Sequence, residues 1–446
     1  MVKDLTNGNP LKLILMFSLP LILGNLFQQF YNMADTIIVG KCLGVSALAS
    51  VGATGSLNFL IMGFATGTCS GLTIPVAQYF GAKDEDNVRR CVANSFYVVL
   101  ALSVVLTALT MLFTRQILEL MQTPADIIDG SYDYLIVIFG GMSVTLLYNL
   151  FSGILRALGD SKTPLYFLVI ASLLNVALDL MFIRVFHTGV EGAAYATVIS
   201  QGVAALLCLA YMIWKFPLLR IKGKDWEFSW GHIKKMLGIG IPMGLQFSIT
   251  AVGSIILQSA VNSLGSSAVA AVSAGSKVQM LLTQPTETLG AAMATYCGQN
   301  LGAMKLDRIR VGVRQATWVS VGFSIAAFLL NVVAGKQISL LFLDAGEVQI
   351  IEDASRFLFM NGMFYPLLSL VTLYRNTIQG LGYAVPAMTA GIFELVGRAA
   401  VSFCLVGTFG YTAVCLANPV AWAAADLLLL PMYFVTLKRL PERLAR

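Results

Sequence analysis

Two aspartates stand in stretches of sequence that are otherwise apolar. Asp35 ends a long apolar run that starts near Leu13, and Asp179 lies within LLNVALDLMFI. If these stretches cross a membrane, each carboxylate costs roughly 3 kcal/mol or more to place there, and a functional use is the default explanation. Two neighbouring carboxylates cannot both stay ionised cheaply in a low dielectric, so a close pair would share a proton or hold a cation.

Neutral oxygen atoms accompany the two aspartates. Asn175 lies four residues before Asp179, one helical turn away on the same face. Thr197 lies in the next apolar stretch, at a similar depth when the rise is counted as 1.5 Å per residue. Amide and hydroxyl oxygens are ligands for Na⁺ and hydrogen-bond partners for a protonated acid. We therefore predict a cation-coupling site for H⁺ or Na⁺ at Asp35, Asn175, Asp179 and Thr197, with no other metal.

Membrane-spanning helices must position these residues. The chain has 446 residues, of which 57% are hydrophobic and only 12% charged, with a mean hydropathy of +0.78. Soluble domains carry about 25% charged residues. Apolar runs long enough to cross a bilayer recur throughout. We predict an all-α polytopic membrane protein with twelve transmembrane helices, near 13–38, 47–78, 92–114, 133–156, 164–186, 192–214, 237–262, 268–297, 312–334, 356–380, 387–408 and 412–436.

The distribution of positive charge predicts an orientation. If the N-terminus lies inside, 22 of the 29 Lys and Arg residues fall on the inner side, Arg375 among them. Five fall outside, and Lys277 and Arg398 lie within spans. This excess follows the positive-inside rule. We predict a multi-pass protein of the cell membrane, either inner or plasma membrane, with both termini cytoplasmic. The same distribution explains the net charge of +6 without a nucleic-acid partner.

Cysteine and histidine form no chemical motif in this chain. The seven cysteines are scattered without a CxxC spacing, and the two histidines are far apart, so we predict neither a disulfide framework nor a transition-metal site. No further constellation for nucleophilic or acid–base catalysis is evident. We therefore expect no cofactor and no enzymatic activity.

The chain repeats itself at an offset of 221 to 223 residues. FSLPLILGN at 17–25 matches IGIPMGLQF at 239–247, and LGVSALASVGA at 43–53 matches LGSSAVAAVSA at 264–274. Two later pairs match in the same order, which indicates an internal repeat. We expect two pseudo-symmetric six-helix bundles, at 1–214 and 236–446. The linker at 215–235 is either an amphipathic segment on the inner membrane surface or a solvated connection.

Proline and glycine occupy informative positions in the spans. Pro20 aligns with Pro242 near the start of the first span of each half, where a missing backbone hydrogen bond permits a bend. Gly63, Gly67 and Gly71 form a ridge in the second span that predicts the close approach of a neighbouring helix.

The C-terminal half does not repeat the two aspartates. By the offset, Asp35 corresponds to Ile256 or Leu257, and Asp179 corresponds to Val401. The predicted cation site is therefore asymmetric, since it belongs to the N-terminal half alone.

The C-terminal half carries charges of its own. Glu394 and Arg398 are four residues apart and can pair on one helix face. Lys277 and Glu287 share a face of another helix, and Asp426 lies in the last span. Polar, charged, aromatic and methionine side chains within spans are candidates to line a substrate cavity, and the candidates are Gln28, Tyr31, Asn32, Phe59, Met62, Tyr148, Phe151, Gln246, Lys277, Glu287, Glu394 and Arg398.

Over nearly its full length the chain resembles the multidrug and toxic-compound extrusion (MATE) family. The resemblance is carried by MADTIIVG at 33–40, AQYFGAKDEDNVRR at 77–90, GILRALGDSKTP at 153–164, NVALDLMFI at 175–183 and GQNLGAMKLDR at 298–308. It implies a cation-binding role for Asp35, Asn175, Asp179 and Thr197. Some members also use acidic residues of the seventh and tenth spans, where this chain has none.

The resemblance implies secondary active efflux. We expect alternating access that exchanges cytoplasmic organic cations or amphipathic drugs for H⁺ or Na⁺, by a protein that acts as a monomer in the lipid bilayer. The alternative within the same superfamily is a flippase or exporter of a lipid-linked or other endogenous metabolite. A flippase for a pyrophosphate-linked lipid should present a strongly cationic cleft, and only Lys277 and Arg398 are available for one. A membrane enzyme and a channel fit the pattern less well.

Overall fold

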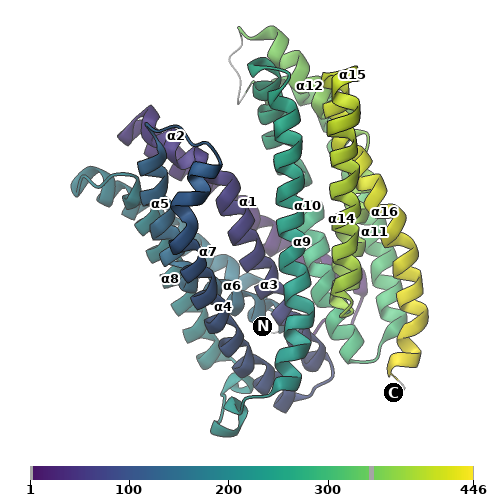
Figure 1. The fold of residues 1–446 in the computed structure, drawn as a ribbon. Helices are drawn as coiled ribbons and strands as arrows, with labels where there is room; N and C mark the ends of the chain where they lie inside the picture. The colour runs from purple at the N-terminus through teal and green to yellow at the C-terminus, as the bar shows by residue number, and fades with distance from the viewer. Residues whose placement is uncertain (1–3, 341–345, 445–446) are drawn as a thin grey trace. The chain divides into compact units, whose positions relative to one another are not determined.

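The computed structural model describes residues 4–340 and 346–444, and all regular structure in these ranges is helical (Figure 1). The predicted all-α architecture is confirmed. The helices of the first half are α1 (Pro10–Leu43), α2 (Val45–Ala53), α3 (Gly55–Gly81), α4 (Glu85–Leu120), α5 (Ile128–Gly140), α6 (Met142–Ala157), α7 (Lys162–Leu180) and α8 (Val190–Lys215). Those of the second half are α9 (Trp230–Asn262), α10 (Ser266–Gly302), α11 (Leu306–Ser339), α12 (Val348–Gly362), α13 (Tyr365–Gly380), α14 (Ala384–Ala400), α15 (Val406–Phe409) and α16 (Tyr411–Leu444).

The helices account for the predicted spans. Within the described residues, nine helices are long and apolar enough to cross a membrane. Two bent pairs raise the number to eleven if each pair is one span, α5 with α6 at 49° and α12 with α13 at 53°. The remaining predicted span, 268–297, falls on α10, whose polar residues include Lys277 and Glu287. The count of twelve is consistent with the structure and stays a prediction.

The internal repeat is visible in the backbone. The bent pairs occupy the same place in each half, and so do two π-helices, η1 (Met181–Val185) after α7 and η4 (Val401–Leu405) after α14. Gly44 and Gly265, which precede α2 and α10, share φ angles of 90° and 94° that favour glycine. The two halves therefore follow the same helical course, down to single residues of unusual conformation.

The chain forms two compact units. The first unit includes Leu19–Gly244, and the second unit consists of Leu5–Ser18 and the chain from Leu245 onward. These limits differ from the predicted halves, 1–214 and 236–446, because the first turns of α1 and α9 belong to the unit of the opposite half. Both changes of unit lie close to the aligned prolines, Pro20 and Pro242. Lys3 and Arg446, two of the predicted inner-side charges, lie outside the described residues.

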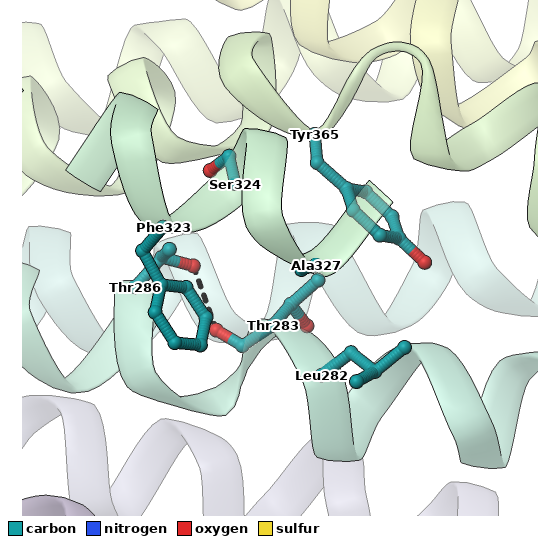
Figure 2. Close-up of a pocket in the computed structure, with 7 residues that line it drawn as sticks. All are labelled: Leu282, Thr283, Thr286, Phe323, Ser324, Ala327 and Tyr365. Carbon is teal, nitrogen blue, oxygen red and sulfur yellow. Dashed lines mark hydrogen bonds between the residues drawn. The ribbon is translucent and has the colours of Figure 1, made fainter. Parts of the chain in front are cut away.

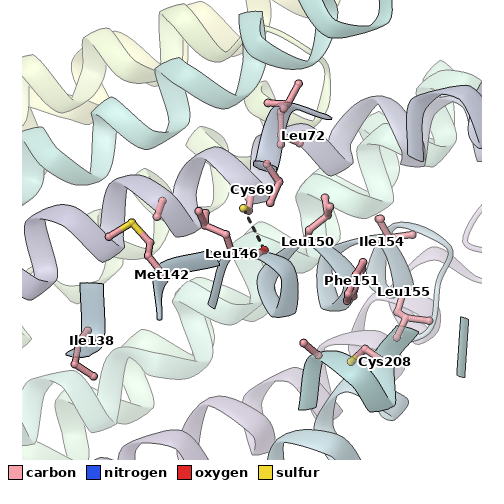
Figure 3. Close-up of a cluster of buried hydrophobic side chains, with 14 of the residues drawn as sticks. Cys69, Leu72, Ile138, Met142, Leu146, Leu150, Phe151, Ile154, Leu155 and Cys208 are labelled. Atoms are coloured by element: carbon pink, nitrogen blue, oxygen red, sulfur yellow. Dashed lines mark hydrogen bonds between the residues drawn. The ribbon is translucent and has the colours of Figure 1, made fainter. Parts of the chain in front are cut away.

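The apolar core of the first unit holds α3, α6 and α8 together (Figure 3). Cys69 of α3 is fully buried and donates its thiol hydrogen to the carbonyl oxygen of Leu146 on α6, at 3.6 Å. Leu72 and Leu150 are also fully buried, and Cys208 of α8 joins the same cluster. This packing fixes α8, one of the three helices that carry the predicted cation site.

The segment before α9 docks onto α4 of the first unit. It contains two 3-10 helices, η2 (Pro217–Leu219) and η3 (Gly223–Trp226). The Asn94 side chain donates to the carbonyl oxygen of Glu227 and accepts from the backbone N–H of Ser229. Arg89 and Asp225 form an ion pair at 3.3 Å. The linker is thus an ordered segment held by side chains of α4.

The segment before α1 docks in the same way within the second unit. Gln299 of α10 accepts a hydrogen bond from the backbone N–H of Leu5, at 3.0 Å. Lys305 donates to the carbonyl oxygen of Thr6, and Arg308 donates to that of Gly8, both at 2.8 Å. The segment that begins each half therefore packs in the unit that consists mainly of the other half.

Glycine allows α3 and α9 to pack closely inside the first unit. A Cβ atom at Gly71 would lie 2.5 Å from the Cα atom of Gly240, and one at Gly240 would lie 2.9 Å from the carbonyl oxygen of Thr68. The close approach predicted for the glycine ridge is confirmed at Gly71. In contrast, a Cβ atom at Gly238 would meet nothing within 4 Å.

We expect Gly240→Ala to lower the stability of the protein by about 1–3 kcal/mol, because the new methyl group meets backbone that must shift. The matched substitution Gly238→Ala lies in the same helix and should be neutral or stabilising by up to about 1 kcal/mol. Thermal unfolding of the two variants in detergent measures the difference. Equal melting temperatures would contradict the close packing of α3 and α9.

Candidate cation site

Three helices of the first unit bring the predicted cation residues together. Tyr31 and Asp35 lie on α1, Asn175 and Asp179 on α7, and Thr197 on α8. The Asn175 side chain donates from Nδ2 to Oγ1 of Thr197 at 3.3 Å. The Tyr31 hydroxyl shares a hydrogen bond with the same Oγ1 atom, also at 3.3 Å. Asn175 and Asp179 are completely buried.

The two carboxyl groups face each other at this site. Asp35 and Asp179 lie within range of direct interaction. Among the described residues, no side chain or backbone group donates a hydrogen bond to either oxygen of Asp179, to Oδ1 of Asp35 or to Oδ1 of Asn175. Buried polar atoms are almost always satisfied in proteins. Four unsatisfied acceptor oxygens at one place therefore match the ligand set of a small cation or the needs of a proton shared between carboxyl groups.

Further features of the structure surround this pair. Tyr134 of α5 is buried and lies close to Tyr31, Asp35 and Asp179, a neighbour that the sequence pattern did not indicate. The π-helix η1 begins two residues after Asp179. Single-turn π-helices are frequent at functional sites because they widen the helix and free backbone groups.

The predicted cavity residues of the first half have diverse surroundings. Tyr31 belongs to the cation site through its hydrogen bond to Thr197. Phe151 is buried in the apolar core of the first unit, 5.4 Å from the ring of Phe96. Met62 and Tyr148 are half-buried against that core, whereas Gln28, Asn32 and Phe59 are exposed. A role in substrate binding stays a prediction for all of them.

The second unit contains a buried charge cluster. Glu394 of α14 accepts hydrogen bonds from Arg375 of α13 at 2.7 Å and from Arg398 at 3.0 Å. The pairing of Glu394 with Arg398 is confirmed. Arg375, which we counted among the inner-side charges, is buried within α13 and bound to Glu394, and its side of the membrane stays a prediction. The contact could not be predicted from the sequence, because its partners are nineteen residues apart and lie on two different helices.

Other polar residues lie near this cluster. Asp426 of α16 is buried near Arg375 and Glu394, and neither of its oxygens has a hydrogen-bond partner among the described residues. Glu287 of α10 interacts electrostatically with the same two residues. Gln246 is buried and accepts a hydrogen bond from Gln379. The side chains of Lys277 and Glu287 are accessible.

A small recess in the second unit lies between α10, α11 and the start of α13 (Figure 2). Its lining is Leu282, Thr283, Thr286, Phe323, Ser324, Ala327 and Tyr365. The hydroxyl of Thr286 donates to the carbonyl oxygen of Thr283 at 2.7 Å, so part of its polar surface is already satisfied. It contains no charged side chain and none of the predicted site residues.

Comparison with known proteins agrees with this architecture. The sequence profile of the MatE family matches residues 20–181 and 242–404, once in each half. A probable multidrug resistance protein of Bacillus subtilis, YpnP, is 31% identical over 398 residues, which cover 88% of this chain and 87% of that protein. An FAD transporter of Shewanella oneidensis is 22% identical over 86% of this chain and 85% of its own length.

A solved structure shows the same fold. It is the outward-facing conformation of a multidrug resistance MATE family transporter of the MOP superfamily, with a TM-score of 0.91, 24% identity and 98% of both chains covered. The profile, the relative and the fold agree over the whole repeat. The chain belongs to the MatE family of multidrug and toxic-compound extrusion transporters and is a multi-pass membrane protein.

Proposed function

We propose that this transporter exports amphipathic organic cations and related drugs in exchange for H⁺ or Na⁺ that binds between Asp35 and Asp179. The observation that supports the proposal is the buried carboxyl pair with its unsatisfied oxygens. An empty, doubly ionised pair is costly in a low dielectric, and a bound cation or proton removes that cost. The first unit should therefore have different preferred arrangements with and without the ion.

Coupling follows if the ion and the drug favour different conformations. A ligand shifts a conformational equilibrium only by its differential affinity for the two states. Asp35 lies on α1, fifteen residues after Pro20, in a helix that changes unit near that proline. Neutralisation of Asp35 removes its repulsion from Asp179 on α7, so α1 is the helix through which ion binding would affect drug binding.

Polar and aromatic groups on α1 suit an amphipathic cation. Gln28 and Asn32 are accessible, and Tyr31 links that surface to the cation site through Thr197. Aromatic faces attract organic cations by about 1–2 kcal/mol when water is excluded. We propose that Phe59 and Met62 of α3 contribute to a broad and adaptable substrate surface in the first unit.

A second candidate function is the export of an anionic endogenous metabolite. The observations that favour it are the FAD transporter among the relatives and the buried arginines Arg375 and Arg398. Both guanidinium groups are bound to Glu394, however, so they are partly neutralised. Competition of dye export by excess flavin nucleotide would favour this alternative over general drug efflux.

The orientation and the assembly complete the proposal. The excess of Lys and Arg on one side favours two cytoplasmic termini in the cell membrane. Each repeat supplies six spans, so both halves enter the membrane from the same side, as in parallel-repeat transporters. The transporter would act as a monomer, because the chain carries its own two-fold repeat.

We expect Asp35→Asn and Asp179→Asn each to reduce gradient-driven dye efflux by roughly tenfold or more, because an amide neither releases a proton nor provides the anionic oxygen that Na⁺ needs. The measurement uses proteoliposomes with a fluorescent cationic dye. Asp126→Asn, which removes an exposed acid of the first unit, is the control and should export normally. Normal efflux by both site variants would refute coupling at this pair.

Efflux measured with a pH gradient alone and with a Na⁺ gradient alone identifies the coupling ion. With a shared proton, an inward pH gradient alone drives efflux, and Thr197→Val lowers the rate only a few-fold, because a proton needs no further ligands. With Na⁺, a Na⁺ gradient alone drives efflux, and Thr197→Val weakens ion affinity by roughly tenfold through the loss of one oxygen ligand. Efflux in the absence of both gradients would contradict ion exchange altogether.

A further inference from the structure

The repeat places the same three-helix arrangement in both units. In the first unit the cation site lies among α1, α7 and α8, and the equivalent helices of the second unit are α9, α14 and α16. At the offset of 222 that aligns Pro20 with Pro242, Tyr31 on α1 corresponds to Gly253 on α9, and Thr197 on α8 corresponds to Asn418 or Pro419 on α16 at offsets of 221 and 222. The second unit therefore has a counterpart of the cation site, built from different side chains.

Arg398 lies in that counterpart. Its position on α14 is one residue beyond the equivalent of Asn175. The Arg398 side chain donates from Nε to Oδ1 of Asn418 at 3.1 Å, whereas Asn175 donates to Thr197 at 3.3 Å. The link between α7 and α8 is thus repeated between α14 and α16, with a guanidinium in place of an amide.

The neighbouring helix is adapted to the guanidinium. A Cβ atom at Gly253 would lie only 2.5 Å from Nη1 of Arg398, so the group packs directly against the backbone of α9. The equivalent position on α1 holds the large Tyr31 side chain, which itself bonds to Thr197. The space that the Tyr31 side chain fills in one unit is left open in the other for a charged group.

The charges at the cation site of the first unit differ from those at its counterpart in the second unit. In the first unit two carboxyl groups lie together, and no cationic side chain of the described residues donates to their unsatisfied oxygens. In the second unit Glu394 provides the carboxylate, and Arg398 binds it at 3.0 Å in a buried environment. Charge-assisted hydrogen bonds of this kind are about twice as strong as neutral ones.

We propose that Arg398 is a tethered cation that fills the second unit's counterpart of the cation site, so that this counterpart site is permanently loaded and binds no exchangeable ion. Arg398 is then a positioning residue that excludes a coupling ion from the second unit's counterpart of the pair formed by Asp35 and Asp179. This inference rests on the proposed function for its consequence in transport, but the occupancy of the counterpart site can be measured without transport.

The test uses the full chain in which Asp35→Asn and Asp179→Asn remove the first unit's carboxyl pair. In this background, Arg398→Ala leaves a space that matches guanidinium, lined by Glu394, Asn418 and Gly253. Guanidinium chloride at low millimolar concentration should raise the melting temperature in detergent by roughly 2–5 °C, as ligand binding to the folded state predicts. Choline chloride at equal ionic strength should have no effect, because the cation is too large and donates no N–H bonds.

Two matched variants complete the design. Arg398→Lys keeps a tethered charge and should not respond to guanidinium. The double variant Glu394→Gln/Arg398→Ala removes the carboxylate together with the guanidinium, so it keeps the net charge of the cluster and should also lose the response. A response confined to Arg398→Ala shows that residue 398 occupies a cation site.

Two results would overturn the proposal. One is a guanidinium response of the same size in the background that retains Arg398. The other is no response in a folded Arg398→Ala protein. The first of these two measurements can be made even if Arg398→Ala does not fold, because it uses the protein that retains Arg398. The measurement compares the change in melting temperature that guanidinium causes with and without Arg398. Its result therefore does not depend on whether Asp35→Asn alters dye efflux.

Discussion

The cost of a charge in a low-dielectric interior governs much of this structure. A buried carboxylate without a partner is unstable, and each unit meets that constraint in its own way. In the first unit, Asp35 and Asp179 lie against each other with oxygens that no described donor satisfies. In the second unit, Glu394 is held by Arg375 and Arg398. We propose that a proton or a cation completes the first arrangement, whereas side chains of the protein already neutralise Glu394 in the second.

Under the proposed function, this difference places the exchangeable cation site in only one half of a repeated molecule. The two halves share bent helix pairs, π-helices and residues with the same unusual φ angles, so the backbone alone is nearly symmetric. Side chains break the symmetry at a few positions, of which Tyr31 and Gly253 are one pair. A scaffold from duplication can thus keep its helix geometry while one copy of a site becomes a fixed ion pair.

The helices α1 and α9 each belong to both units. The first turns of each helix pack in the unit of the opposite half, and the segments before them are held by side chains of α4 or by α10 and α11. Each helix changes unit near an aligned proline, where the backbone hydrogen-bond ladder is interrupted. A change in how Asp35 binds its neighbours therefore acts on a helix that is part of both units.

Much of the fold and of the candidate site could be predicted from the sequence. Apolar runs predicted the helices because each span must be apolar over roughly 20 residues, and the offset of the repeat predicted which helices correspond. Asp35, Asn175, Asp179 and Thr197 could be expected at one depth, because helical rise is regular. These are local or periodic properties, and sequence encodes them directly.

Tertiary structure decided the rest. The contacts of Arg375 with Glu394 and of Arg398 with Asn418 join residues on different helices, so no spacing along the chain reveals them. The same holds for the electrostatic interaction of Tyr134 with the two aspartates. The unit to which the first turns of α1 and α9 belong is likewise set by packing. Sequence determined which charges enter the membrane-spanning helices. Only the packing of those helices decided which charges are paired with another side chain and which carboxyl oxygens have no donor among the described residues.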